Sequence, residues 1–441
     1  MPSPQRPSFS IPVASATSVL NGRPARDHTS PWRFTWLLAA PHRLGFFSAA
    51  LMFAFSALWW SGLLWGRALG WTPGWSLSPP SAHSLLMTLG FMPLFFVGFL
   101  FTAGPKWLGL PDVAARVLVL PVAAMLLGWL VTVAGFHTHA LLSAAGLSLV
   151  ALGWSALCLR FDFMVVRSQA PDRVHATLVA VACSVGALAL WCAVPGLALG
   201  EELWLKSVVQ VALWCFVATT FAVVSHRMLP FFSASALPLL DAWRPFWLVG
   251  VLAGLLWLQA PLALAELWLW PLPAWVRWTQ AAIELPASIL LLGLALRWGL
   301  IQSMKIRLLA MLHAGFVWLG IAFGLAAISH VLMALSQGEL SLGLAPTHAL
   351  TMGYLGGTLL AMATRVSSGH SGRPLAADNP VWFLYWLLHA GVLLRVLAAL
   401  WPAHATGLTL MAALAWSTVC VGWALRYGNW FGRMRVDGKP G

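Results

Sequence analysis

Long apolar runs separated by short polar connections dominate the chain from residue 41 onward. A helix rises about 1.5 Å per residue and needs about 20 apolar residues to cross the hydrocarbon of a bilayer. The pattern therefore predicts an all-α, polytopic integral membrane bundle of about twelve transmembrane helices, at Leu44–Gly66, Ala82–Gly104, Val113–Gly135, Ala140–Leu159, Val174–Val194, Leu203–Met228, Phe246–Leu267, Val276–Leu296, Leu308–Val331, Leu344–Thr364, Val381–Trp401 and Thr406–Tyr427. We expect a disordered cytoplasmic leader (1–40), a single membrane domain (41–430) and a cytoplasmic tail (431–441).

The distribution of basic residues predicts the orientation of this bundle. Most of the 25 lysine and arginine residues fall in connections on one side of the predicted crossings, and only Arg67, Lys206 and Arg277 fall in connections on the other. Cytoplasmic connections are enriched in these residues. An even number of crossings places both termini on the same side, and the basic connections indicate that this side is the cytoplasm. We therefore expect both termini in the cytoplasm.

Composition supports the membrane class and excludes others. The chain is 60% hydrophobic and only 8% charged, with a mean hydropathy of +0.83. Its net charge of +13 comes from single basic residues between apolar runs, so we expect the lipid bilayer as partner and no nucleic acid. The five cysteines contain no C-x-x-C pair, which argues against disulfides and zinc–thiolate sites.

The second predicted crossing carries a histidine in its first turn. The stretch Ser81–Leu108 begins with His83 and closes with Gly104-Pro105-Lys106-Trp107, which predicts a helix break at a membrane surface. Lipid offers no hydrogen-bond partner, so an imidazole at this depth requires a metal, a polar group or water.

The tenth predicted crossing matches the second. It begins at the same face with His348, and Gly353 and Gly357 have the small-xxx-small spacing of closely packed helices. Two histidines at one depth on two helices are what bis-imidazole ligation of haem b requires. The alternative is that His83 and His348 cap their helices or bond a carbonyl.

Three further residues extend this hypothesis. Met87 and Met352 each follow a candidate ligand by four residues and share its helix face. Arg395 lies in the eleventh crossing at the depth where haem propionates would sit, and a guanidinium suits carboxylates. Snorkelling to the membrane surface or pairing with Glu284 are its alternatives.

Glu284 is an ionisable group inside the eighth crossing, just before Pro286. It could move protons or accept a hydrogen bond from a histidine. The structural alternative is a pair with Arg277, seven residues earlier on the same helix face.

The chain resembles the NnrS family in segments that span most of its length. The resemblance rests on His83, Met87, Pro93 and Gly98 with the closing Gly104-Pro105-Lys106-Trp107, on SHRMLPFF at 225–232, on IRLLAMLHAGF around His313, and on THALTMGYLGGTLLAMATRVSSGHSGRPL at 347–375. It implies a bacterial inner-membrane protein with haem and copper, linked to nitric oxide metabolism or nitrosative-stress resistance in denitrifying and related bacteria. Whether it is an enzyme acting on nitric oxide stays open, and redox activity would need an external electron donor.

The second crossing also resembles that of haem-copper oxidase subunit I, where an H-x-x-x-M…P pattern carries a haem ligand. Two departures argue against an oxidase-type binuclear centre. The tenth crossing has no second histidine beside His348, and the seventh has none. Any copper would need another set of ligands.

Candidates for this second set lie towards the predicted cytoplasmic half. His226, His313 and His389 are the expected ligands, because imidazole suits both copper and haem iron. A structural role through hydrogen bonds is the alternative for each. The basic connection after the tenth crossing, with Arg365, His370 and Arg373, fits lipid headgroups, an anionic ligand or the propionates of an inner haem.

Two functional hypotheses follow. The first is a haem-bearing membrane protein, with or without copper, that acts in nitric oxide metabolism. The second is a twelve-span secondary transporter or exporter, in which buried histidines, Glu284 and Arg395 form a substrate or proton path. The sequence leaves the oligomeric state and the number of haems open.

Overall fold

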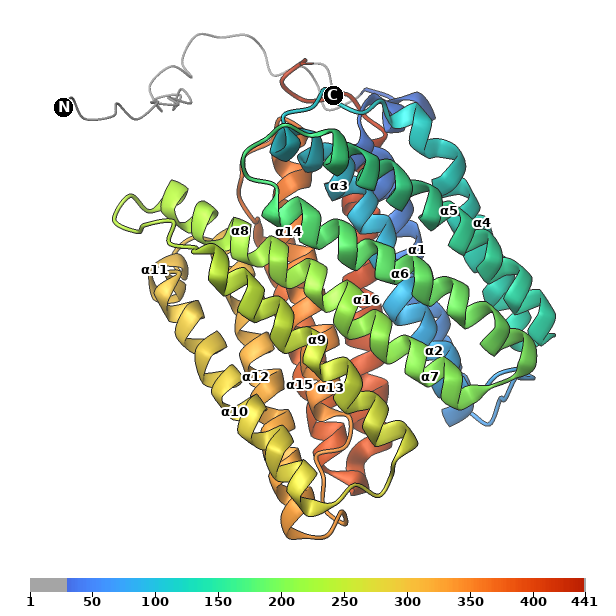
Figure 1. Cartoon of the computed structure of the whole chain (residues 1–441). Coiled ribbons are helices and arrows are strands. Elements are labelled where there is room, and N and C mark those ends of the chain that lie inside the picture. The colour runs from blue at the N-terminus through green and yellow to red at the C-terminus, as the bar shows by residue number, and fades with distance from the viewer. Residues whose placement is uncertain (1–29, 440–441) are drawn as a thin grey trace.

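The computed structural model describes residues 30–439, and within them helices are the only regular secondary structure (Figure 1). Most of the predicted disordered leader, residues 1–29, lies outside the described residues. Residues at its end form the short helix η1 (Phe34–Ala39), in which Leu37 is fully buried. This last part of the predicted leader is therefore part of the folded bundle.

Within the described residues, eleven helical stretches are long and apolar enough to cross a membrane. They are α1 (Pro41–Ala68), α2 (Pro79–Leu89) with α3 (Met92–Leu108), η2 (Ala115–Leu118) with α4 (Val119–His137), α5 (Ala140–Arg167), α6 (Val174–Leu199), α7 (Glu202–Val211) with η3 (Ala212–Ala218) and α8 (Thr219–Ala236), α9 (Phe246–Trp268), α10 (Ala274–Arg297), α12 (Arg307–Leu335), α15 (Asn379–Leu400), and η5 (Pro402–His404) with α16 (Ala405–Phe431). The short α11 spans Leu300–Ser303. The chain is a multi-pass, all-α membrane protein.

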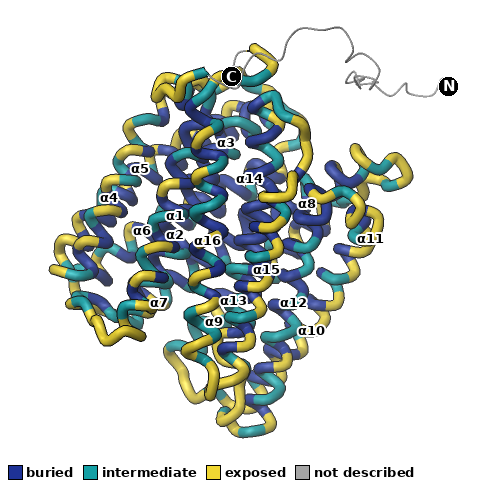
Figure 2. Tube along the Cα trace, turned by 180° about the vertical axis from the view of Figure 1, so that it is seen from behind, coloured by how far each residue is buried: buried dark blue, intermediate teal, exposed yellow. Residues whose placement is uncertain are grey.

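The tenth predicted crossing is a helix of a different kind. It runs through α13 (Ala345–His348), the π-helical η4 (Ala349–Gly356) and α14 (Gly357–His370), and it is not among the eleven apolar stretches. Most of its residues are buried, and it packs against α12, α15 and α16 in the interior of the bundle (Figures 1 and 2). Because protein surrounds it, this helix tolerates Thr, Tyr, Gly and His residues that lipid would not.

Two glycines allow this central helix to approach α12 closely, as their spacing predicted. A Cβ atom at Gly353 would lie 2.6 Å from Cγ of Trp318, and one at Gly357 would lie 3.3 Å from Cα of Gly315. Real Cβ atoms have no room at 2.6 Å, so only glycine fits at Gly353, while the contact at Gly357 would be tight.

The helix interruption in the second crossing lies elsewhere than predicted. The break falls at Gly90 and Phe91, and α3 then runs through Pro105 to Leu108. It ends because Gly109 has the left-handed φ of 63° and donates its N–H to the Pro105 carbonyl. The predicted break at Gly104–Trp107 was wrong, since a proline this near a helix end removes only one hydrogen bond.

The described chain begins and ends at the same end of the bundle, which we call the terminal end; the opposite end is the far end. The Arg33 N–H donates to the Gly432 carbonyl over 2.8 Å. The Arg43 guanidinium donates to the carbonyls of Phe431 and Arg433 over 3.4 and 2.7 Å. An even number of crossings agrees with this arrangement, while the cytoplasmic location of the terminal end stays a prediction.

Candidate functional site

The first turn of α2, which directly precedes His83, is fixed by a carboxylate from α7. Glu202 accepts hydrogen bonds from the Ser78 backbone N–H over 2.8 Å and from the Ser81 hydroxyl over 2.7 Å. A negative charge at a helix N-terminus is also favoured by the helix dipole. Sequence reasoning missed Glu202, whose only signal was an acidic residue at the start of an apolar run.

His83 lies in an apolar setting with one ring nitrogen unsatisfied. Its ring stacks on Trp60 of α1, with centroids 4.1 Å apart and planes 22° apart. Its Nδ1 is buried and has no hydrogen-bond partner among the described residues. Leaving such an atom unpaired costs about 1–3 kcal/mol, so His83 has the chemistry of a residue prepared for a ligand.

His348 has a defined tautomer. Its Nδ1 lies 2.9 Å from the Leu344 carbonyl oxygen, which only accepts, so Nδ1 carries the hydrogen and Nε2 carries the free lone pair. Metal-bound histidines commonly have this arrangement, in which a carbonyl orients the ring. The π-helical η4 begins at the next residue, and π-helical turns often occur at functional sites.

The fold brings the predicted far-end residues together. The charges of His83, His348 and Arg395 lie within electrostatic range of one another, although α2, α13 and α15 are far apart in sequence. Arg395 forms no ion pair within residues 30–439, so its predicted alternative partner Glu284 is not its partner.

The two methionines expected at this site are half-buried. Met87 and Met352 both pack against the apolar core. Their contact with a cofactor stays a prediction.

His226 forms a fully satisfied pair with His175. Its Nε2 lies 3.2 Å from the Pro245 carbonyl oxygen and must donate to it, so its Nδ1 accepts from Nε2 of His175 over 2.9 Å. The remaining Nδ1 of His175 then accepts from Arg227 over 3.4 Å. Neither ring keeps a free lone pair, which favours the structural alternative for His226.

His389 and His313 differ from His226 in having one unsatisfied nitrogen each. Nδ1 of His389 accepts from the indole N–H of Trp318 over 2.9 Å, so the hydrogen of the neutral ring is on the buried, unpartnered Nε2. Nε2 of His313 lies 2.9 Å from the Ser233 hydroxyl, and its Nδ1 is buried without a partner.

The three histidines expected to bind copper are not brought together. Across residues 30–439, no group of three or more His, Cys, Asp or Glu side chains is arranged to hold a metal ion. His226, His313 and His389 instead contact separate partners. The three histidines therefore do not fit as a common copper site. Binding of a metal by any one of them stays a prediction.

The basic connection at the terminal end is packed on aromatic rings. The Arg365 guanidinium lies 4.0 Å from the Phe232 ring centroid, and that of Arg373 lies 4.1 Å from the Trp430 centroid. His370 lies against His42 of α1, with ring centroids 4.4 Å apart. An anionic ligand or an inner haem at this place stays a prediction.

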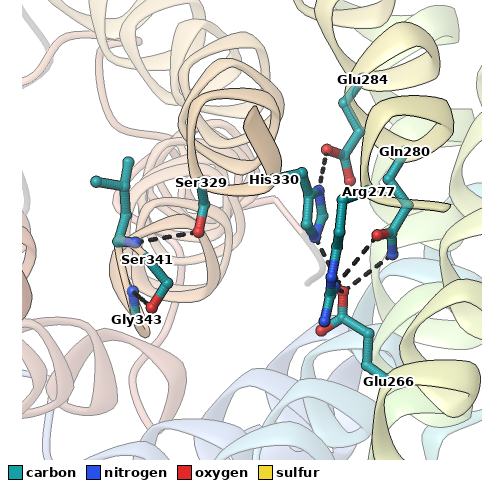
Figure 3. A network of polar contacts seen from close by, with 9 residues as sticks. Glu266, Arg277, Gln280, Glu284, Ser329, His330, Ser341 and Gly343 are labelled. Carbon is teal, nitrogen blue, oxygen red and sulfur yellow. Dashed lines mark hydrogen bonds and ion pairs between the residues drawn. The ribbon is translucent and has the colours of Figure 1, made fainter. Parts of the chain in front are cut away.

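A buried polar network at the far end includes Glu284, as Figure 3 shows. Its Oε2 lies 2.6 Å from Nδ1 of His330, and Nε2 of His330 lies 2.9 Å from Oε1 of Glu266. Glu284 therefore bonds a histidine, as one alternative expected. Arg277 pairs with Glu266 and Gln280 instead of Glu284, which corrects the structural alternative.

Glu266, Gln280 and His330 belong to this network although the sequence did not predict them as site residues. Their signal was present, since each is a polar residue within or at the end of an apolar run. Their grouping required the packing of α9, α10 and α12, which hydrophobic patterning does not specify.

Comparison with known proteins agrees with this architecture. The family described as NnrS protein matches residues 36–435, nearly the whole chain. Comparison with curated proteins finds no match. The likeness to haem-copper oxidase subunit I stays a resemblance of the second crossing alone. The match from η1 to the residues after α16 shows that this chain belongs to the NnrS family.

Proposed function

We propose that this chain is a haem-binding protein of the bacterial inner membrane that acts in nitric oxide metabolism or nitrosative-stress resistance. His83 and His348 would hold a haem b through their imidazole nitrogens. The observation that carries the proposal is the state of their ring nitrogens. His348 has a free Nε2 lone pair held in place by the Leu344 carbonyl, and His83 has a buried nitrogen without a partner.

The surrounding side chains support this assignment chemically. Arg395 carries a guanidinium without a carboxylate partner among residues 30–439, and haem propionates would supply one. Trp60 orients the His83 ring by stacking, and Glu202 holds the helix turn that precedes it. When bound, a haem iron held by two histidines would supply the capacity to exchange electrons.

Copper is not part of the proposal at the expected trio of histidines. His226 has no free lone pair, and the hydrogen-bonded tautomer of His389 places a hydrogen on its remaining nitrogen. We derive no step through copper from these residues.

A secondary transporter is the second candidate function, and a specific observation favours it. The buried network of Glu266, Arg277, Glu284 and His330 is of the kind that carries protons or substrates through membranes. A transporter of this design would function without haem.

An optical spectrum of the purified full chain separates the two. We expect a reduced-minus-oxidised b-type signal that is lost in His83→Ala and His348→Ala and kept in the matched variant His226→Ala. A colourless wild-type protein, after expression with haem supplied, would overturn the haem proposal and leave the transporter. Retention of the full signal in both ligand variants would overturn the assignment of the ligands.

A further inference from the structure

Three ionisable side chains form a line from the far-end surface into the bundle. The Glu266 side chain, near the end of α9, is 33% exposed, that of His330 on α12 is 12% exposed, and that of Glu284 on α10 is 2% exposed. Glu284 is ten residues beyond the α10 start at Ala274, which corresponds to about 15 Å along the helix axis. The line therefore leads from a partly exposed carboxyl near the far end of α9 to a carboxyl deep in the bundle.

Hydrogen bonding joins the three groups without a gap. The His330 ring bridges the two carboxyls, with Nδ1 2.6 Å from Glu284 and Nε2 2.9 Å from Glu266. An ionised carboxylate only accepts, and a neutral imidazole has a single N–H. Both contacts can be hydrogen bonds only if the network holds one more proton, on the ring or on one carboxyl.

Charge balance points to the same extra proton. Two carboxylates, the Arg277 guanidinium and a neutral His330 would leave one net negative charge in a low-dielectric region. One added proton makes the group neutral, which removes the cost of burying a net charge. The added proton can reside on the His330 ring or on one of the two carboxyls, because hydrogen bonds join all three groups.

Other charged and polar groups surround the Glu266 end of the line. Arg277 and Gln280 both contact Glu266 at the surface end. On α7, which packs against α9, Glu202 and Lys206 are the charged groups, and Glu202 is held by Ser78 and Ser81.

Beyond Glu284, the nearby Ser288 hydroxyl donates its hydrogen bond elsewhere. Ser288 follows Glu284 by one helical turn and donates to the Gly320 carbonyl over 2.7 Å. Glu266 has the most exposed side chain of the three, so we expect exchange with water to run through it.

We propose that Glu266, His330 and Glu284 form a proton-loading path, through which the aqueous phase at the far end protonates and deprotonates the buried Glu284. In one loading step, protonated Glu266 gives its proton to Nε2 of the Nδ1–H tautomer of His330. The resulting imidazolium gives its Nδ1 proton to the Glu284 carboxylate. One proton has then moved from Glu266 to Glu284, and the ring is left as the Nε2–H tautomer. Unloading is the reverse sequence. The path needs no haem, so it stands or falls independently of the proposed haem site, whereas the transporter candidate uses the same residues.

Infrared spectroscopy of the full chain in lipid tests the path. A step from about pH 9 to about pH 5 crosses the ordinary pKa of histidine, about 6.5, and stays above that of an exposed glutamate, about 4.3, so exposed carboxyls stay ionised. We expect a carboxylic acid C=O band that exchanges in D₂O, and we expect Glu284→Gln to lack it. The matched control is Glu339→Gln, which changes an exposed glutamate in the same way and should keep the band.

Two variants that change the first two groups of the line, here called the entrance variants, distinguish a proton path from a purely structural contact between α9, α10 and α12. Removing a positioned proton donor slows transfer by on the order of a hundredfold, so Glu266→Gln and His330→Gln should slow exchange of the Glu284 band by that factor. A purely structural contact would give lower unfolding temperatures with unchanged exchange.

The proposal is overturned if the wild type has no such band, if Glu284→Gln keeps it, or if both entrance variants exchange at the wild-type rate. Should Glu284→Gln fail to fold, isotope-edited spectra of the two entrance variants still decide the matter.

Discussion

Two histidine pairs at opposite ends of the bundle differ in the hydrogen bonding of their ring nitrogens. At the terminal end, His175 and His226 lie 2.9 Å apart, and every ring nitrogen has a partner. At the far end, the Nδ1 of His348 donates to a carbonyl and its Nε2 is free, while the Nδ1 of His83 is orphaned. The comparison teaches that neighbouring histidines suggest a metal site only when lone pairs remain for the metal.

The largest expected effect is on haem content. His348→Gly should remove the bound haem, because only His83 would remain to hold it. Added imidazole should restore the spectrum by filling the space of the missing side chain. The measurement is haem absorbance per mole of protein.

The matched variant for this experiment is His226→Gly, which should keep its haem with or without imidazole. Equal haem loss in both variants would contradict the proposal that only the far-end histidines bind haem.

The second effect is on stability, where the His226 variant should lose more than the His83 variant. His226→Ala should lower the free energy of unfolding by about 1–3 kcal/mol, because it leaves His175 and the Pro245 carbonyl unsatisfied. In haem-free protein, His83→Ala should cost less than this, because the lost stacking on Trp60, worth about 0.5–1.5 kcal/mol, is offset by removal of the unpaired Nδ1. Unfolding in detergent, followed by tryptophan fluorescence, gives both values. A larger loss for His83→Ala would contradict the assignment of its Nδ1 as unpartnered.

The third effect tests how the far-end pair is positioned. Glu202→Gln weakens the charge-assisted bonds from Ser78 and Ser81 that fix the first turn of α2. We expect haem affinity to fall by about tenfold, equivalent to about 1.4 kcal/mol, since such bonds are about twice as strong as neutral ones. A haem titration of the apo protein measures it. Glu201→Gln, at the exposed neighbouring position, is the control and should bind haem like the wild type.

The smallest effect is expected in the tail at the terminal end. Hydrogen bonds from the Arg435 guanidinium hold the pKa of the Asp437 carboxyl below its usual range. A lowered pKa means that this contact is complete above the ordinary aspartate pKa of about 3.9 and is lost as the pH falls through the lower value of the folded protein. Asp437→Asn should therefore raise tryptic cleavage after Arg435 slightly at neutral pH. Haem content and unfolding temperature should stay unchanged, and a change in either would show that the tail acts on the bundle.

The sequence by itself determined the class of this protein and most of its helices. Apolar runs of sufficient length predict membrane helices, because a backbone in lipid must satisfy its own hydrogen bonds. The glycine spacing at Gly353 and Gly357 predicted a close helix approach, because only a missing Cβ allows it. Motifs around His83 and in 347–375 were sufficient to indicate the family.

Only the tertiary structure decided which polar groups meet and in which protonation state. Burial of the tenth crossing, the bond from His348 to Leu344 and the His175–His226 pair depend on how separate helices pack. So does the position of His330 between Glu266 and Glu284, which lie on three different helices. Hydrophobic periodicity fixes that a helix forms and which face is apolar. Contacts between helices distant in sequence depend on side-chain shape and hydrogen bonding across the bundle, which no local pattern encodes.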